Sequence, residues 1–221
     1  MKPLTSIERK FFPNCKSQLF QDFFVLNELG FKRNGYFVEF GANDGIRDSN
    51  TYMLEKDFGW DGILAEPSHV NHPALFKNRS NVKIDINCVW KESGKQIEFL
   101  ECHGGAHVVS TIEKFRNQDG AGNRRKYGNI YSVNTISLTD LLIKHQAPQI
   151  IDYLSIDTEG SEYEILSNFD WDKYTFKIIT VEHNYVVEMR NQIHELLYSH
   201  GYEKKYVEMS YIDDWYVKSI P

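Results

Sequence analysis

Short apolar segments alternate with amphipathic segments along most of the chain. In the first kind nearly every position is apolar, which is typical of strands covered on both faces of a parallel sheet. These segments span residues 35–40, 62–67, 151–157 and 176–184. In the second kind apolar residues recur at helical spacing, and these segments span residues 18–31, 49–60, 161–169 and 186–201. The alternation predicts an α/β fold with a mostly parallel sheet and helices on both faces.

Weaker patterns complete the predicted sheet. Residues 69–79 favour a short helix, residues 81–90 a further strand, and residues 95–102 its antiparallel neighbour. A strand followed by a helix is predicted over residues 131–146. Residues 202–218 contain two strand patterns around a turn, so we expect an antiparallel hairpin at one edge of the sheet.

Residues 103–129 show little periodicity and are rich in glycine, asparagine and arginine. The segment is too long for an ordinary connection in a compact domain. We expect it either to be mobile or to cover an active site, where it would contact an acceptor. It would belong to a single domain spanning residues 1–221, which opens with an N-terminal helical segment, 1–34.

Composition narrows the function classes. The chain has 221 residues and a formal net charge of −6, which argues against a broad basic face for nucleic acid. No apolar stretch reaches the ~18 residues of a membrane span, and the N-terminus lacks the apolar core of a secretion signal. The three cysteines are widely spaced, so neither a disulfide framework nor a zinc site is expected. We expect a cytoplasmic protein that acts on a small molecule or a glycan.

Acidic and amide residues follow the carboxyl ends of almost all predicted strands. Ligands of parallel α/β sheets bind beyond those ends. Like charges gathered there repel one another unless a cation or hydrogen bonds balance them. This edge therefore suits a cation or a hydroxyl-rich group. Its residues are Glu39, Asn43, Asp44, Glu66, Asp85, Asn87, Asp157, Glu159, Glu182, His183 and Asn184.

The turn from Gly41 to Gly45 leaves the first strand, and Glu66 ends the second. Their separation is close to the roughly 20 residues between a glycine-rich turn and an acid that binds ribose hydroxyls. The turn is not the G-x-G-x-x-G of dinucleotide sites, and no lysine follows it to hold a phosphate. Polar side chains and a nearby acid suit a nucleoside that carries an amino acid and a positive sulfur. S-adenosylmethionine is therefore the predicted cofactor.

Several motifs resemble the FkbM-type S-adenosylmethionine-dependent methyltransferases over roughly residues 17–217. They are "SQLFQDFFVLNELG", "GYFVEFGANDGIRDSNTYMLEKDFGWDGILAEPS", "VNTISLTDLL", "IDYLSIDTEGSEYEIL" and "VEHN". The resemblance implies a Rossmann-like class I methyltransferase fold, with a seven-stranded sheet and a reversed edge hairpin. It also implies O-methylation of sugar hydroxyls in glycans or glycosylated metabolites. Gln21 and Asp22 would close over the cofactor, and Glu39 stands where many relatives carry aspartate.

Each part of the cofactor has a predicted contact. Gly41, Asn43 and Gly45 would contact the methionine part, in a loop that Glu39 orients. Glu66 would accept the ribose hydroxyls. Asn87 would meet the adenine edge, with Asp85 as the alternative.

A sugar hydroxyl needs a base, or a metal that lowers its pKa, before it attacks a methyl group. His183 is the predicted base because the usual pKa of histidine lies near 6.5, and Asp157 and Glu182 are the alternatives. Asp157 would also lie at the cofactor. Asp157 and Glu182, with Glu159 and His183, would otherwise bind Mg²⁺ or a similar divalent cation through oxygen ligands, or simply shape the loop.

Residues of the 103–129 segment are the predicted acceptor contacts. These are His107 and the cluster of Arg124, Arg125 and Lys126, whose charge favours an anionic glycan or a nucleotide-linked sugar, unless the cluster only forms a solvated loop. Two other functions stay open at this point. A non-catalytic nucleoside- or glycan-binding module would keep the fold, and a nicotinamide-dependent oxidoreductase would share it, although the absence of G-x-G-x-x-G argues against the latter.

Overall fold

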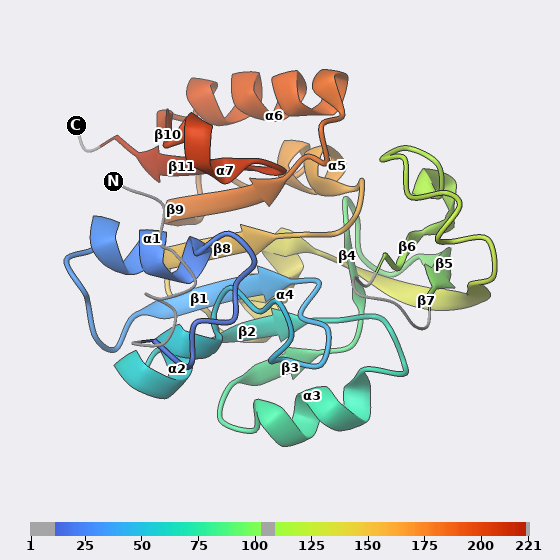
Figure 1. Ribbon diagram of the computed structural model, residues 1–221, viewed down its shortest axis with the longest axis horizontal. Coiled ribbons are helices and arrows are strands. Elements are labelled where there is room, and N and C mark those ends of the chain that lie inside the picture. The colour runs from blue at the N-terminus through green and yellow to red at the C-terminus, as the bar shows by residue number, and fades with distance from the viewer. Residues whose placement is uncertain (1–11, 103–108, 220–221) are drawn as a thin grey trace.

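A seven-stranded sheet forms the centre of the computed structural model, which describes residues 12–102 and 109–219 (Figure 1). The strand order is β10-β11-β9-β8-β1-β2-β3. Neighbouring strands are parallel except at β11, which is antiparallel to both β9 and β10. The predicted mostly parallel sheet with an antiparallel edge is thus confirmed. Its strands are β1 (Tyr36–Phe40), β2 (Asp61–Ala65), β3 (Lys83–Asp85), β8 (Ile150–Ile156), β9 (Thr175–Glu182), β10 (Tyr202–Lys205) and β11 (Asp213–Lys218).

Helices cover both faces of this sheet, as predicted. Successive side chains of a strand point to opposite faces, so Phe37 packs with the first group of helices and Val38 and Phe40 with the second. Both faces of the central strands are buried under helices, which explains why these strands are apolar at almost every position. The first group is α1 (Gln21–Glu28), α2 (Tyr52–Phe58) and α3 (His72–Asn78), and the second is α4 (Leu138–Lys144), α5 (Glu162–Ser167) and α6 (Val187–Ser199).

A second sheet, of four strands, was not predicted. Its order is β4-β7-β5-β6. The segment 81–90, expected as one strand, divides into β3 in the large sheet and β4 in the small one. Residues 95–102 pair with β7 and β6 instead of with 81–90, so that prediction was wrong. The strands are β4 (Cys88–Trp90), β5 (Gln96–Glu101), β6 (Thr111–Ile112) and β7 (Asn129–Ser137), and a 3₁₀ helix, η2 (Glu113–Phe115), follows β6.

A side-chain turn divides the 81–90 segment. Asp85 Oδ1 accepts hydrogen bonds from the backbone N–H and from the amide Nδ2 of Asn87, at 3.0 and 2.7 Å. The other carboxylate oxygen lies 2.8 Å from both Lys144 Nζ and His145 Nε2. These bonds hold the chain in a turn between β3 and β4, so the strand cannot continue.

The small sheet lies beyond the carboxyl ends of β1, β2 and β8, on the right in Figure 1. The loops that leave those strands therefore run between the two sheets. At the C-terminal edge, a short helix, α7 (Val207–Ser210), stands in the connection between β10 and β11, where the sequence predicted only a turn. Among the residues described, no helix has the length and apolar character needed to cross a membrane.

Candidate active site

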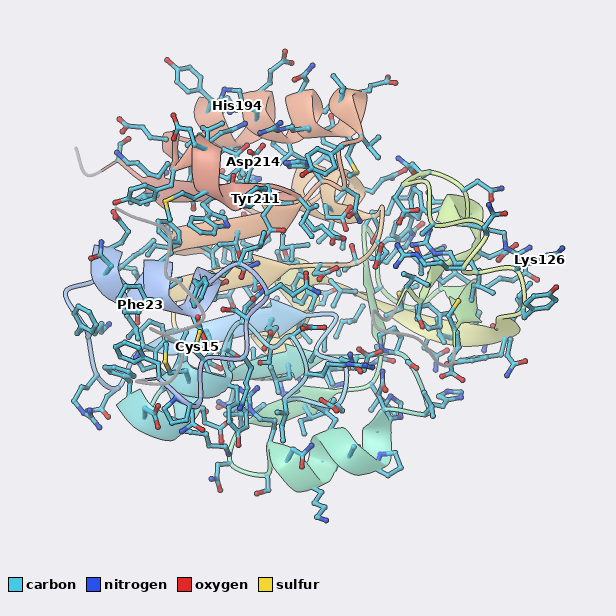
Figure 2. The ribbon with its side chains drawn as sticks, in the orientation of Figure 1. Cys15, Phe23, Lys126, His194, Tyr211 and Asp214 are labelled. Carbon is cyan, nitrogen blue, oxygen red and sulfur yellow. The ribbon has the colours of Figure 1, made fainter. Side chains whose placement is uncertain are left out.

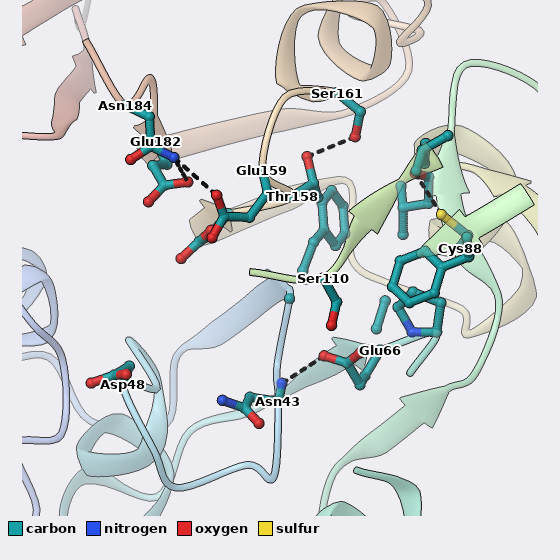
Figure 3. Close-up of a pocket in the computed structure, with 18 of the residues that line it drawn as sticks. Asn43, Asp48, Glu66, Cys88, Ser110, Thr158, Glu159, Ser161, Glu182 and Asn184 are labelled. Carbon is teal, nitrogen blue, oxygen red and sulfur yellow. Dashed lines mark hydrogen bonds between the residues drawn. The ribbon is translucent and has the colours of Figure 1, made fainter. Parts of the chain in front are cut away.

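A cavity of about 290 Å³ lies between the edge of the large sheet and the small sheet (Figure 3). Its floor comes from the loops after β1, β2, β8 and β9, and its roof from β4, β5 and β6. The floor is acidic and the roof mostly apolar. Floor residues include Gly41, Asn43, Glu66, Asp157, Glu159, Glu182 and Asn184, and roof residues include Cys88, Val89, Phe99 and Ile112.

Gly41 lets the ends of β1 and β8 meet beneath the cavity. Its φ is +71°, in the left-handed region, and a Cβ atom there would lie 2.0 Å from the carbonyl oxygen of Asp157. No side chain fits that space without moving backbone. Glycine is therefore required for the chain to bring the first loop against Asp157.

Glu66 is anchored through the same loop. Its Oε2 accepts the backbone N–H of Asn43 at 2.7 Å, and its Oε1 accepts the N–H of Ser68 at 2.8 Å (Figure 3). Burial raises the pKa of Glu66 to about 7, and these two bonds oppose the rise. Each carboxylate oxygen can accept a second hydrogen bond, so the side chain is fixed and retains acceptor capacity for a ligand.

Three carboxylates of the cavity floor lie close together. One oxygen from each of Asp157, Glu159 and Glu182 lies within 4.8 Å of the others. Asn184 Nδ2 donates to Glu182 at 2.7 Å and to Glu159 at 3.1 Å (Figure 3). Arg125 Nη2 donates to Glu159 at 3.0 Å. Burial raises the pKa of all three, that of Asp157 to about 7, and the charge of Asp157 raises the pKa values of Glu159 and Glu182 further. The predicted gathering of Asp157, Glu159 and Glu182 is therefore present.

Half of the predicted cofactor residues line the cavity, and half lie behind it. Gly41, Asn43, Glu66 and Asp157 line it. The other four, Gln21, Glu39, Gly45 and Asn87, form contacts within the protein instead.

Each of these four has a structural partner. Gln21 Nε2 donates to Asp213 Oδ2 at 2.6 Å, while Gln18 reaches the cavity in its place. Glu39 accepts the backbone N–H of Asn50 at 2.6 Å, so it orients the loop before α2. A Cβ at Gly45 would lie 2.5 Å from Arg79 Cγ, which shows that this glycine packs against the C-terminal end of α3. Asn87 donates its hydrogen bonds to the Asp85 carboxylate, and neither residue lines the cavity. Direct adenine contact by either residue is therefore not supported.

His183 is also turned away from the cavity. Its Nδ1 accepts the backbone N–H of Tyr185 at 3.0 Å, and its Nε2 lies 3.1 Å from the carbonyl oxygen of Asp213. These partners require a neutral ring with the proton on Nε2. Burial lowers the pKa of His183 further. Both ring nitrogens are occupied, so the predicted role of His183 as base or metal ligand is not supported, and Asp157 and Glu182 remain.

The adjacent arginines of the 103–129 segment have separate positions. Arg124 is exposed and lines the cavity, whereas the Arg125 side chain is buried. Direct acceptor contact by Arg125 is therefore not supported. His107 lies outside the described residues.

Sequence reasoning assigned no role to Glu162 or to Asn184. The buried Glu162 carboxylate accepts the backbone N–H groups of Thr158 and Gly160 at 2.9 and 3.1 Å, so it fixes the loop that carries Asp157 and Glu159. The acid two residues after the glycine of "DTEGSE" was the available signal. Asn184 was visible at the end of a strand, but its bridging bonds depend on the tertiary fold.

Solved structures that resemble this one include methyltransferases. The METTL16 methyltransferase domain is 10% identical, with a TM-score of 0.51 over 98% of this chain and 70% of that one. A TehB-like SAM-dependent methyltransferase from Corynebacterium glutamicum is 6% identical, with a TM-score of 0.46 over 97% and 96%. No protein of curated function matches the sequence at a significant level. The likeness to these structures shows the fold, which is that of class I methyltransferases.

The family follows from the sequence itself. The profile of the methyltransferase FkbM domain matches residues 39–204. This range includes Gly41, Glu66 and the three clustered carboxylates. The chain belongs to the FkbM methyltransferase family, which confirms the resemblance noted from its motifs.

Replacing Glu182 by glutamine is expected to stabilise the protein at alkaline pH. Because its pKa is raised well above the usual 4.5 in the folded state, its ionised form destabilises that state. The penalty is absent below about pH 4.5 and grows as the pH rises toward the folded pKa. Calorimetry should show a melting temperature raised by about 2–4 °C per kcal/mol gained near pH 8, and no gain near pH 4.5.

The exposed Glu188 provides a matched control. Glu188→Gln should leave the melting temperature within about 1 °C of wild type at both pH values, since surface substitutions change stability little. A lower melting temperature for Glu182→Gln at alkaline pH would show that the carboxylates stabilise one another, contrary to the electrostatic argument.

Proposed function

We propose that this enzyme transfers a methyl group from S-adenosylmethionine to a sugar hydroxyl of a glycan, a nucleotide-linked sugar or a glycosylated metabolite. The observation that carries the proposal is the meeting of Asp157, Glu159 and Glu182 in the cavity that also contains Glu66. A hydroxyl must lose its proton to attack a methyl group. Clustered carboxylates with raised pKa values suit that task.

The cavity residues fit the cofactor by charge and by shape. Glu66 offers a fixed carboxylate to the ribose hydroxyls. Pro67, Val89 and Phe99 line the cavity too, as apolar neighbours for adenine. A sulfonium and an ammonium group are both cationic and suit the acidic floor near Asp157. The bound cofactor supplies an already activated methyl group, so the protein mainly aligns the reacting atoms.

Glu66→Ala should weaken binding of S-adenosylhomocysteine by roughly 10- to 100-fold, as expected when charged hydrogen bonds to the ribose are lost. Isothermal titration calorimetry measures this directly. The exposed Glu98 of β5 provides the control, and Glu98→Ala should bind as wild type. An affinity within about 2-fold of wild type for Glu66→Ala would remove this carboxylate from the cofactor site.

Asp157 is the proposed proton acceptor, with Glu182 beside it. Asp157 lines the cavity at the end of β8, and burial raises its pKa to about 7. A carboxylate of ordinary pKa is too weak a base for a hydroxyl, and the rise improves the match. One carboxylate oxygen of Glu182 lies within 4.8 Å of one of Asp157.

Asp157→Asn is expected to slow methyl transfer by about 10²-fold or more at saturating S-adenosylmethionine, where a weaker affinity for the cofactor does not account for the loss. Transfer of labelled methyl groups into a sugar acceptor measures the rate. The wild-type rate should fall as the pH drops below about 7, because Asp157 then becomes protonated. The exposed Asp172 offers the control Asp172→Asn. Full activity in Asp157→Asn would contradict its role as the base.

A divalent cation is a second candidate at the same carboxylates. Three carboxylates are balanced by a single guanidinium, that of Arg125, among the residues described. Oxygen ligands at this spacing suit Mg²⁺ or a similar hard cation. Such a cation would lower the pKa of the acceptor hydroxyl and relieve the repulsion.

Mg²⁺ is expected to raise the melting temperature of wild-type protein above its value in EDTA, because a ligand that binds only the folded state stabilises it. In Glu182→Gln the increment should shrink, since one ligand is lost. EDTA should lower the methyl-transfer rate and Mg²⁺ should restore it. Equal melting temperatures and equal rates in Mg²⁺ and EDTA would exclude the cation and leave the carboxylates as bases.

A further inference from the structure

One buried side chain, that of Arg125, connects the loop before β7 to the carboxylates of the cavity floor. Arg125 is 0% exposed. Its guanidinium donates to the carbonyl oxygens of Val109 and Arg116 at 2.6 and 3.0 Å, and to both oxygens of Asp119 at 2.5 and 2.6 Å. The fifth bond, of 3.0 Å, goes to Glu159 in the carboxylate cluster. A guanidinium with five bonds holds the loop in one arrangement.

This anchor fixes the position of the preceding residue. The N–H groups of Arg124 and Arg125 both donate to the carbonyl oxygen of Ala121, at 2.8 and 3.2 Å. The two arginines therefore stand on one tight turn, with Arg125 directed inward and Arg124 lining the cavity. Arg124 forms no ion pair with any residue that the structure describes. Arg124 thus lines the cavity on a turn that Arg125 fixes, and without an ion pair among the described residues its guanidinium is available to a ligand.

Charge is unevenly distributed over the cavity walls. The floor has Glu66, Asp157, Glu159 and Glu182, which are largely buried. Two exposed arginines, Arg47 from the loop after β1 and Arg124 from the loop before β7, also line the cavity. A ligand with a neutral hydroxyl end and an anionic end can enter in only one favourable orientation, with the anion among the arginines.

We propose that Arg124 binds an anionic group, phosphate or carboxylate, of the sugar acceptor and so selects a charged acceptor over a neutral one. The inference rests on the proposed methyl transfer to a sugar. Binding the anion at the rim directs the hydroxyl toward the carboxylates and keeps the negative charge away from them. Arg125 is the positioning residue that holds Arg124 there.

The test is a set of calorimetric titrations at constant ionic strength, with and without saturating S-adenosylhomocysteine. The probes are UDP-glucose, glucose 6-phosphate, glucuronate and the neutral methyl glucoside. Wild-type protein should bind at least one anionic probe about 10-fold or more tightly than methyl glucoside, as expected for a charged hydrogen bond. UDP-glucose and glucose 6-phosphate report on phosphate, and glucuronate on carboxylate.

Two substitutions on the same turn separate a specific contact from general attraction. Arg124→Ala should abolish the preference for the anionic probe without changing S-adenosylhomocysteine affinity. Lys126→Ala is the matched control, because Lys126 is exposed and projects from the outer side of the small sheet, away from the cavity (Figure 2). Lys126→Ala should retain the wild-type preference for the anionic probe over methyl glucoside.

Two results would overturn the inference: no anionic probe binds more tightly than methyl glucoside, or the preference persists in Arg124→Ala. Failure of S-adenosylhomocysteine to bind would instead contradict the cofactor assignment. Since the probes are also titrated without it, the two failures remain distinguishable.

Discussion

The close approach of β1 and β8 is the constraint on which the site depends. With only hydrogen at Gly41, the first loop can lie against the carbonyl of Asp157. The loop then turns through the left-handed φ of Asn43, +52°, whose N–H fixes Glu66 at the end of the next strand. One contact thereby sets the distance between the proposed ribose acceptor and the proposed base. The parallel pairing brings the carboxyl ends of β1 and β8 to the same edge, and Gly41 allows the loops after them to come into contact.

Buried carboxylates near this edge fall into two groups. Glu39 and Glu55 are compensated, because the buried Arg79 lies beside both and the residues before α2 donate to Glu39. Asp157 and Glu182 have no such cation among the described residues, and burial raises the pKa of each. Charged groups are rarely buried without partners in parts of a protein that serve stability alone. Carboxylates that line the cavity without a nearby cation are therefore the candidates for function.

The sequence predicted those features that depend on local pattern. Uniformly apolar segments gave the central strands, and the acids after them gave Glu66, Asp157 and Glu182 at one edge. It did not predict the small sheet, because the turn at Asp85 and Asn87 depends on side-chain bonds and because strand patterns do not name their partners. His183 was misjudged for a similar reason, since its ring direction depends on Tyr185 and Asp213.

The small sheet has a consequence for how such an enzyme diversifies. It is built from residues 88–137, a continuous stretch inserted after β3, while the large sheet holds Glu66 and Asp157. Substitutions within this one stretch therefore change the roof of the cavity, including the proposed adenine neighbours Val89 and Phe99 as well as Arg124, without altering Glu66 or Asp157. The Arg125–Glu159 ion pair connects this stretch to the loop after β8. Substitutions near either residue therefore have to preserve this contact.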